Sequence, residues 1–195
     1  MPRVEVISRR RLLDDFFKVD EAQLRFERHD GTMSGVVRRL NFERGDSAAA
    51  LIVDLTKRTV YLVEQFMYPT LEKAGGWVTT VAAGMIDAGE TPEQTIRREI
   101  LEEAGFEAER IEPISTFFVS PGGSSERIVL FCALVSDAAR KSAGGGVASE
   151  NEDIKVTETP LDEFLARLSS GELQDAKTII AGYWLKDNLA RLLQG

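Results

Sequence analysis

The 195-residue chain is poor in cysteine and histidine and contains no long apolar run. Cys132 is the only cysteine, so no internal disulfide can form, and a reducing cytoplasm is the expected location. His29 is the only histidine, which leaves too few ligands for a zinc site. No apolar run approaches the length of a bilayer span, and the N-terminus lacks the apolar core of a secretory signal.

Positive charge is also scarce. The chain has 32 acidic residues against 24 lysines and arginines, a formal net charge of -8. This balance argues against a non-specific nucleic-acid binder, which needs a basic face. The same charge would repel a phosphate substrate, so either clustered arginines or bound metal must mediate such a contact. The arginines of the first 45 residues that form such a cluster are Arg9, Arg10, Arg11, Arg38, Arg39 and Arg44.

Strands and helices occur without regular βαβ alternation, which indicates an α+β fold with a mixed β-sheet sandwiched between helices. Residues 1–45 alternate apolar and polar residues in places and contain a hairpin signal at Asp30-Gly31, so they predict an antiparallel sheet. Residues 46–195 are expected to form the main domain, which contains several strands, one of them over 77–83. Helices are predicted over 91–104, 160–168 and 176–193, the last two capped by Thr159 and Asp175.

The predicted helix over 91–104 has well-specified ends. Thr91 is a plausible N-cap, Gln94 completes a capping box three residues later, and Gly105 supplies the C-terminal stop. One face of this helix is apolar and is expected to pack on the sheet. The residues of that face are Ile96, Ile100 and Ala104.

The same helix carries three carboxylates on another face, because Glu99, Glu102 and Glu103 are spaced i, i+3, i+4. Their mutual repulsion would be relieved by a hard cation such as Mg²⁺ or Mn²⁺, which prefers carboxylate oxygens. Arg98, one turn before Glu102, can hold that side chain by a charge-assisted contact. The alternative for such a charge run is a solvated helix face.

The segment GMIDAGETPEQTIRREILEEAGF, residues 84–106, resembles the Nudix box G-x5-E-x7-R-E-U-x-E-E-x-G-U, with U apolar, at every position. The resemblance covers nearly the whole chain and is closest to the ADP-ribose and GDP-mannose pyrophosphatases. Outside the box it is carried by residues 37–39, 43–46, 64–65, 120–123 and 150–154. It implies a Nudix fold with an N-terminal antiparallel sheet.

The resemblance also implies an activity, which is magnesium-dependent hydrolysis of the pyrophosphate of ADP-ribose or a related nucleoside diphosphate sugar. The products would be a nucleoside monophosphate and a sugar phosphate. Such proteins form homodimers, and residues 1–45 would serve dimerisation and complete the partner's substrate site. The partners expected are therefore a small nucleotide and a second copy of the chain, without nucleic acid or membrane.

Roles at the site follow from the same resemblance. Glu150 would be the general base, Glu102 would assist through water or a further ion, and the glycines of 144–146 would form a hinge. For Glu150 and Glu152 the alternative is an exposed acidic loop. The catalytic set is Glu150, Glu102 and Arg98, and the metal set is the backbone oxygen of Ala83 with Glu99, Glu103 and Glu152.

Further residues are expected to bind substrate. Phe16 would stack on the base with Phe17 beside it, although Phe16 could equally be ordinary core. Arg39, with Arg38 and Arg44, would bind phosphates or the adenosine part, and the alternative for these arginines is surface solubility. The segment 120–122 would line the site, although it also resembles a plain turn. The substrate set is Phe16, Phe17, Arg38, Arg39, Arg44, Ser120, Pro121, Gly122 and Glu126.

Two departures from the family pattern leave the substrate open. Met67 stands where arginine is usual, and Thr79-Thr80 stand where Leu-Glu is usual. One alternative is therefore a GDP-mannose or other nucleotide-sugar pyrophosphatase. Another is a non-catalytic Nudix domain that senses a nucleotide, although every carboxylate of the box is present.

Overall fold

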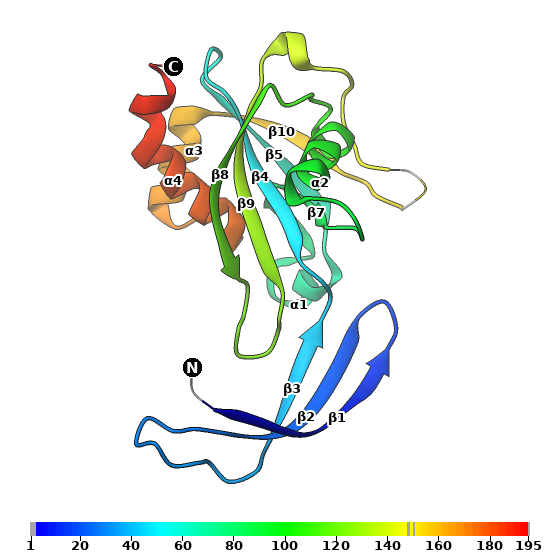
Figure 1. Ribbon diagram of the computed structural model, residues 1–195. Coiled ribbons are helices and arrows are strands. Elements are labelled where there is room, and N and C mark those ends of the chain that lie inside the picture. Colours follow the sequence, from blue (N-terminus) through cyan, green and yellow to red (C-terminus); the bar gives the residue numbers. More distant parts are fainter. Residues whose placement is uncertain (1–2, 148, 150, 195) are drawn as a thin grey trace. The chain divides into compact units, whose positions relative to one another are not determined.

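The structure is a computed structural model that describes residues 3–147, 149 and 151–194 (Figure 1). Two compact units make up the chain. Met1–Gly45 and Phe118–Arg127 form the first unit, and Asp46–Phe117 and Ile128–Gly195 form the second. No helix among the described residues is long and apolar enough to cross a membrane.

The first unit contains the predicted antiparallel sheet, in the order β1 (Val4–Asp14), β2 (Lys18–Phe26) and β3 (Val37–Glu43). Phe16 and Phe17 lie in the turn between β1 and β2. Asp30 and Gly31 lie in the connection between β2 and β3, where Gly31 has a φ of 80°. The hairpin signal therefore marked a real reversal of the chain.

A loop from much later in the chain joins this unit. The backbone N–H of Phe42 donates to the carbonyl of Gly123 at 2.8 Å, and Ser124 Oγ donates to the carbonyl of Phe42 at 3.0 Å. Ser125 Oγ donates to Glu43 Oε2 at 2.5 Å. These bonds hold residues 118–127 against the end of β3.

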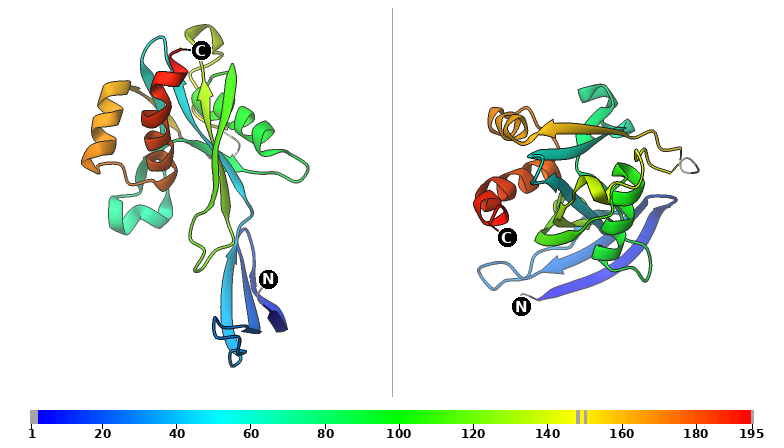
Figure 2. Two further views of the ribbon diagram at one scale, coloured as in Figure 1. Left: turned by 60° about the vertical axis from the view of Figure 1, so that its left-hand side comes forward. Right: turned by 90° about the horizontal axis from the view of Figure 1, so that it is seen from above.

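The second unit is a seven-stranded mixed sheet with helices on both faces (Figures 1 and 2). Its main order is β10-β5-β4-β9-β8, with β6 on β5 and β7 on β4, and β4 and β9 are parallel. The strands are β4 (Ser47–Asp54), β5 (Thr59–Phe66), β6 (Trp77–Thr80), β7 (Ala82–Met85), β8 (Arg110–Phe118), β9 (Arg127–Leu134) and β10 (Lys155–Pro160). The helical segments are η1 (Tyr68–Thr70), α1 (Leu71–Ala74), α2 (Pro92–Glu99), η2 (Ile100–Ala104), η3 (Asp137–Ala139), α3 (Leu161–Ser170) and α4 (Ala176–Leu192).

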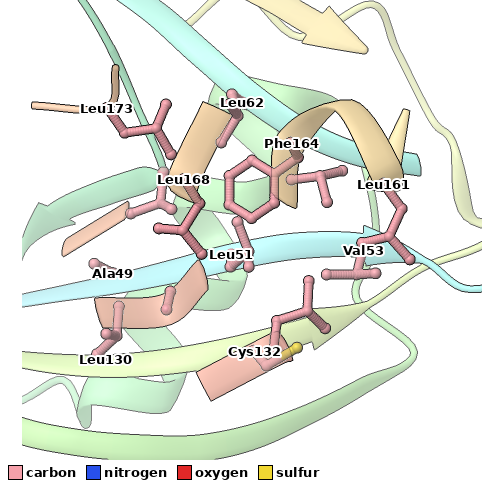
Figure 3. Close-up of a cluster of buried hydrophobic side chains, with 14 of the residues drawn as sticks. Ala49, Leu51, Val53, Leu62, Leu130, Cys132, Leu161, Phe164, Leu168 and Leu173 are labelled. Carbon is pink, nitrogen blue, oxygen red and sulfur yellow. The ribbon is translucent and has the colours of Figure 1, made fainter. Parts of the chain in front are cut away.

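Strand β4 lies at the centre of a helix–sheet–helix arrangement, and all eight of its residues are buried. Successive side chains of a strand point to opposite faces. Its odd-numbered apolar residues, such as Leu51, pack with Phe164 of α3 and Leu185 of α4, and Figure 3 shows part of this cluster. Its even-numbered apolar residues, such as Ile52, pack with residues of α2 and η2. The prediction of a mixed sheet sandwiched between helices is confirmed.

Two local predictions were wrong. The strand predicted over 77–83 is two strands that break at Val81, because β6 pairs with β5 whereas β7 pairs with β4. Thr159 does not cap α3, since it belongs to β10 and the N-cap is Pro160, without a side-chain capping bond. The cap predicted at Asp175 is confirmed, because its side chain accepts from the backbone N–H of Thr178.

Candidate active site

The predicted helix that carries the carboxylates, called the acidic helix below, consists of α2 and η2. It has the predicted extent but not a uniform geometry. Thr91 and Gln94 form both bonds of the capping box, and Gly105 ends the helix in the left-handed region, with a φ of 77°. Residues Ile100–Ala104 widen into a π-helical turn. Such turns inside α-helices are frequent at functional sites.

Two carboxylates of this helix are largely removed from solvent. Ile96, Ile100 and Ala104 are fully buried against β4, as predicted. Glu103 is only 4% exposed, and the side chain of Glu99 is 12% exposed. A solvated acidic face, which was the alternative, does not describe these two side chains.

Strand β7 lies directly against the two buried carboxylates. The backbone N–H of Ala83 donates to Glu103 Oε2 at 3.0 Å. A Cβ atom at Gly84 would lie 1.8 Å from Glu99 Oε1, so this close approach requires glycine. Because the N–H of Ala83 points away from β4, its carbonyl in this antiparallel pair also points away from β4. The backbone of Ala83 thus borders the carboxylates, where the resemblance places it.

Arg98 holds two carboxylates of the helix, Glu99 and Glu102, in place. Its Nη1 donates to Glu99 Oε1 at 2.8 Å and to Glu102 Oε2 at 3.1 Å, which includes the predicted contact. Its Nη2 donates to Glu90 Oε2 at 3.3 Å. Glu90 also accepts from Thr95 Oγ1 at 2.8 Å. Glu90 is a residue that sequence reasoning missed, although its fixed position in the box is a signal for it.

Glu152, in the loop before β10, lies near the carboxylates of the acidic helix and forms a carboxylate cluster with them. It lies close enough to Glu99 and Glu103 for its charge to raise the pKa of both carboxyls. Its Oε2 accepts from the backbone N–H of Val147 at 2.9 Å. The predicted base, Glu150, lies outside the described residues.

The glycine stretch before Glu152 packs on the end of the acidic helix. The N–H groups of Gly145 and Gly146 donate to the carbonyls of Glu103 and Glu102 at 2.9 and 3.0 Å. A Cβ atom at Gly144, whose φ is 74°, would lie 2.3 Å from the carbonyl oxygen of Glu103. Close approach therefore accounts for glycine at 144, and a hinge over 144–146 stays a prediction.

The electrostatics of the cluster favour a bound cation. Burial raises the pKa of Glu103 to about 8, and the nearby charges of Glu99, Glu152 and Glu102 add to the effect. Burial also raises the pKa of Glu99, against the opposing effect of Arg98. A divalent cation would stabilise the ionised carboxylates, and the ligands on offer are all oxygen atoms, as Mg²⁺ and Mn²⁺ prefer.

The cluster is not a complete metal cage by itself. Among the described residues, no three side chains of Asp, Glu, His or Cys are arranged to hold a metal ion. Mg²⁺ commonly binds through one or two carboxylates together with waters and substrate phosphates. The carboxylates present fit a cation that is shared with a phosphate substrate.

The raised pKa of Glu103 gives a testable pH dependence. Its carboxyl ionises near pH 4.5 in the unfolded chain and near pH 8 in the folded metal-free protein. Between these values the unfolded chain binds fewer protons, so the contribution of Glu103 to stability is lost as the pH rises from 4.5 to 8. We expect metal-free wild type to lose melting temperature across this range relative to Glu103→Gln. Saturating Mg²⁺ should raise the melting temperature of wild type more at pH 8 than at pH 5. Equal Mg²⁺ shifts at both pH values would contradict this assignment.

All nine predicted substrate residues lie in the first unit. Phe16 is 75% exposed, so the alternative that it is ordinary core is wrong. Phe17 packs on Phe16 and on Phe42, with ring centroids 4.8 and 5.0 Å apart. The guanidinium of Arg44 lies over the Phe17 ring at 5.6 Å, and its Nε is 3.6 Å from Glu126 Oε1. The structure thus brings Phe16, Phe17, Arg44 and Glu126 together.

The other predicted substrate residues of this unit have different neighbours. Ser120, Pro121 and Gly122 are exposed in a turn in which the carbonyl of Ser120 accepts from the N–H of Gly123 at 3.0 Å. Arg38 is paired with Glu21, a buried acid that we had not singled out and that also binds Arg10 at 2.6 Å. Arg39 lines a cavity of about 750 Å³ on the sheet. The other arginines that line this cavity are Arg9, Arg10 and Arg11.

The two departures from the family pattern have different surroundings. Thr80 is buried, 3% exposed, and its Oγ1 donates to Asp175 Oδ2 at 2.9 Å, so its side chain is engaged with the start of α4. Met67 is half-buried, and its carbonyl accepts from Thr70 Oγ1 at 2.9 Å. The threonine therefore has a structural partner inside the unit.

Comparisons with known proteins identify the family of the chain. The NUDIX domain family model matches residues 43–180. An ADP-ribose pyrophosphatase of Escherichia coli strain K12 is 39% identical over 186 residues, covering 94% of this chain and 88% of the relative. A GDP-mannose pyrophosphatase of Pectobacterium atrosepticum is 34% identical over 181 residues, covering 91% of each chain.

A solved structure described as an ADP compounds hydrolase shares the fold, with a TM-score of 0.72 at 18% identity. The alignment covers 95% of this chain and 96% of that one. The family match spans most of the chain and includes the acidic helix with all its carboxylates. The chain therefore belongs to the Nudix family and is a hydrolase of that family.

Proposed function

We propose that the protein hydrolyses the pyrophosphate bond of ADP-ribose, with water as the second reactant and AMP and ribose 5-phosphate as products. The observation that carries the proposal is Glu103, a buried carboxylate beside Glu99 and Glu152 whose ionised form a bound cation would stabilise. The substrate is taken from the Escherichia coli ADP-ribose pyrophosphatase, which is 39% identical over nearly the whole chain.

Residues of the second unit would bind the metal, orient its ligands and accept a proton. Glu99, Glu103, Glu152 and the carbonyl of Ala83 would hold Mg²⁺, with Mn²⁺ as a substitute. The cation would neutralise charge on the pyrophosphate. Glu102 would assist at this site, and Arg98, which donates to both Glu99 and Glu102, would keep them oriented. Glu150 would accept the proton of the attacking water.

The residues of the first unit would bind the rest of the substrate. The exposed ring of Phe16 is suited to stacking on a base, and the arginines supply positive charge for phosphates. We further propose a homodimer in which residues 1–45 complete the partner's site, while residues 46–195 form the hydrolase domain. A cytoplasmic location is proposed from the single cysteine, Cys132.

The role of Phe16 can be tested by replacing it with alanine. We expect KM for ADP-ribose to rise by about 5- to 150-fold, because base stacking on an aromatic ring contributes about 1–3 kcal/mol. The value of kcat should change little, since the carboxylates are untouched. The control is Leu12→Ala, which removes an exposed apolar side chain from the adjacent strand β1. An unchanged KM for Phe16→Ala would remove the residue from the substrate set.

A second candidate substrate is GDP-mannose, because the Pectobacterium relative is 34% identical over most of the chain. Purified protein with Mg²⁺ would be given ADP-ribose, GDP-mannose, ADP-glucose and a nucleoside triphosphate in parallel, and the phosphorylated products identified. Fastest release of AMP and ribose 5-phosphate supports the proposal. Preferential release of GMP would reassign the substrate, and no hydrolysis of any compound would favour a nucleotide sensor.

A further inference from the structure

The strand that carries the metal-site backbone begins at an irregular point. β6 pairs with β5 up to Thr80, and β7 pairs with β4 from Ala82. Val81 lies between the two pairings. Its N–H donates to a side chain instead of a strand, Thr178 Oγ1 at 3.1 Å. Two residues later, the N–H of Ala83 donates to Glu103.

Asp175 binds the side chains that lie where the chain changes its pairing from β5 to β4. Its Oδ2 accepts from Thr80 Oγ1 at 2.9 Å, from Thr178 Oγ1 at 2.8 Å and from the N–H of Thr178 at 2.9 Å. Its Oδ1 accepts from Lys177 Nζ at 2.6 Å. One carboxylate therefore contacts the last residue of β6 directly and the next residue, Val81, through the hydroxyl of Thr178.

These bonds exceed what a helix cap requires. Capping α4 needs only the bond from the N–H of Thr178 to Asp175. The hydroxyls of Thr80 and Thr178 are in side chains that are 3% and 0% exposed, so both are ordered polar groups inside the protein. Their bonds join the start of α4 to the last residue of β6, Thr80, and to Val81 at the break.

We infer that Asp175, with Thr80 and Thr178, is a positioning device that sets where the chain crosses from β5 to β4 and so holds Ala83 and Gly84 against Glu103 and Glu99. Asp175 and Thr80 are positioning residues that act through Val81. The inference rests on the proposed metal site, since it concerns the placement of Ala83 beside the cation ligands. Pairing with β4 fixes the register of β7, and the network fixes the start of that strand.

The test measures Mn²⁺ affinity by electron paramagnetic resonance of the free ion, in full-length protein well below its melting temperature. Thr80→Val removes one hydroxyl at nearly constant volume, and Asp175→Asn changes the shared acceptor. Changes to the outer partners of metal ligands weaken metal binding by about 10–100-fold. We expect the dissociation constant to rise about tenfold in both variants. Thr80→Ser keeps the donor and should bind within about twofold of wild type.

The matched control is Leu185→Ala, a fully buried position in the same helix that makes no bond of the network. We expect it to lower the melting temperature and leave Mn²⁺ affinity unchanged. Equal affinity in wild type, Thr80→Val and Asp175→Asn would overturn the inference alone, as would equal weakening by Leu185→Ala. Absence of Mn²⁺ binding by wild type would overturn the proposed metal site, and the inference with it.

Discussion

Replacing Glu103 with glutamine is expected to lower the rate of ADP-ribose hydrolysis by more than about a hundredfold. Even changes to the outer partners of metal ligands cost about 10–100-fold, and Glu103 is proposed as a ligand itself. The fold should survive, because the glutamine carbonyl can still accept from the N–H of Ala83. Removal of a buried charge beside Glu99 should leave the metal-free variant at least as stable as wild type at pH 8.

The measurement combines initial rates of AMP release with melting temperatures in the presence and absence of Mg²⁺. The control is Glu163→Gln, which makes the same chemical change at an exposed position of α3. We expect the control to retain full activity and the Mg²⁺-dependent rise in melting temperature. Loss of that rise together with activity in Glu103→Gln identifies a cation ligand. Wild-type rates in Glu103→Gln would refute the assignment.

Replacing Gly84 with alanine is expected to lower activity by about a hundredfold through the displacement of one side chain. The new Cβ would lie 1.8 Å from Oε1, 2.2 Å from Cδ and 2.8 Å from Cγ of Glu99, so the carboxylate must move. A misplacement of about 1 Å at a catalytic group can cost about a hundredfold. Gly84 does not have a positive φ, so backbone strain adds nothing to this effect.

Gly84→Ala would be assayed for Mn²⁺ affinity as well as for turnover, since a displaced Glu99 should weaken both. Gly35→Ala is the matched control, because a Cβ atom there meets nothing within 4 Å and its φ is not positive. If Gly84→Ala keeps both turnover and Mn²⁺ affinity, Glu99 does not act from its position beside β7.

Local patterns made the acidic helix predictable. Its start depends on Thr91 and Gln94, which are three residues apart, and its end depends on Gly105. The contact of Arg98 with Glu102 spans one helical turn. Interactions of this kind can be read from sequence because helical spacing fixes which side chains meet.

Contacts between distant segments were not predictable in this way. The break at Val81 depends on which strands β6 and β7 join, and Asp175 meets Thr80 across 95 residues. The burial of Glu103 depends on where β7 passes the helix. Ser125 meets Glu43 across 82 residues, which is why the grouping of 118–127 with β3 was missed. Spacing along the chain carries no information about such pairs.

The most direct test of the metal-dependent mechanism is a titration of Mg²⁺ into metal-free wild-type protein with ADP-ribose as substrate. We predict no AMP release in the presence of a chelator, and a rate that rises to saturation as Mg²⁺ is added. AMP and ribose 5-phosphate should form in equal amounts at every point. An undiminished rate in the chelator would contradict the account, because hydrolysis would then not depend on a cation held by the carboxylates of the acidic helix.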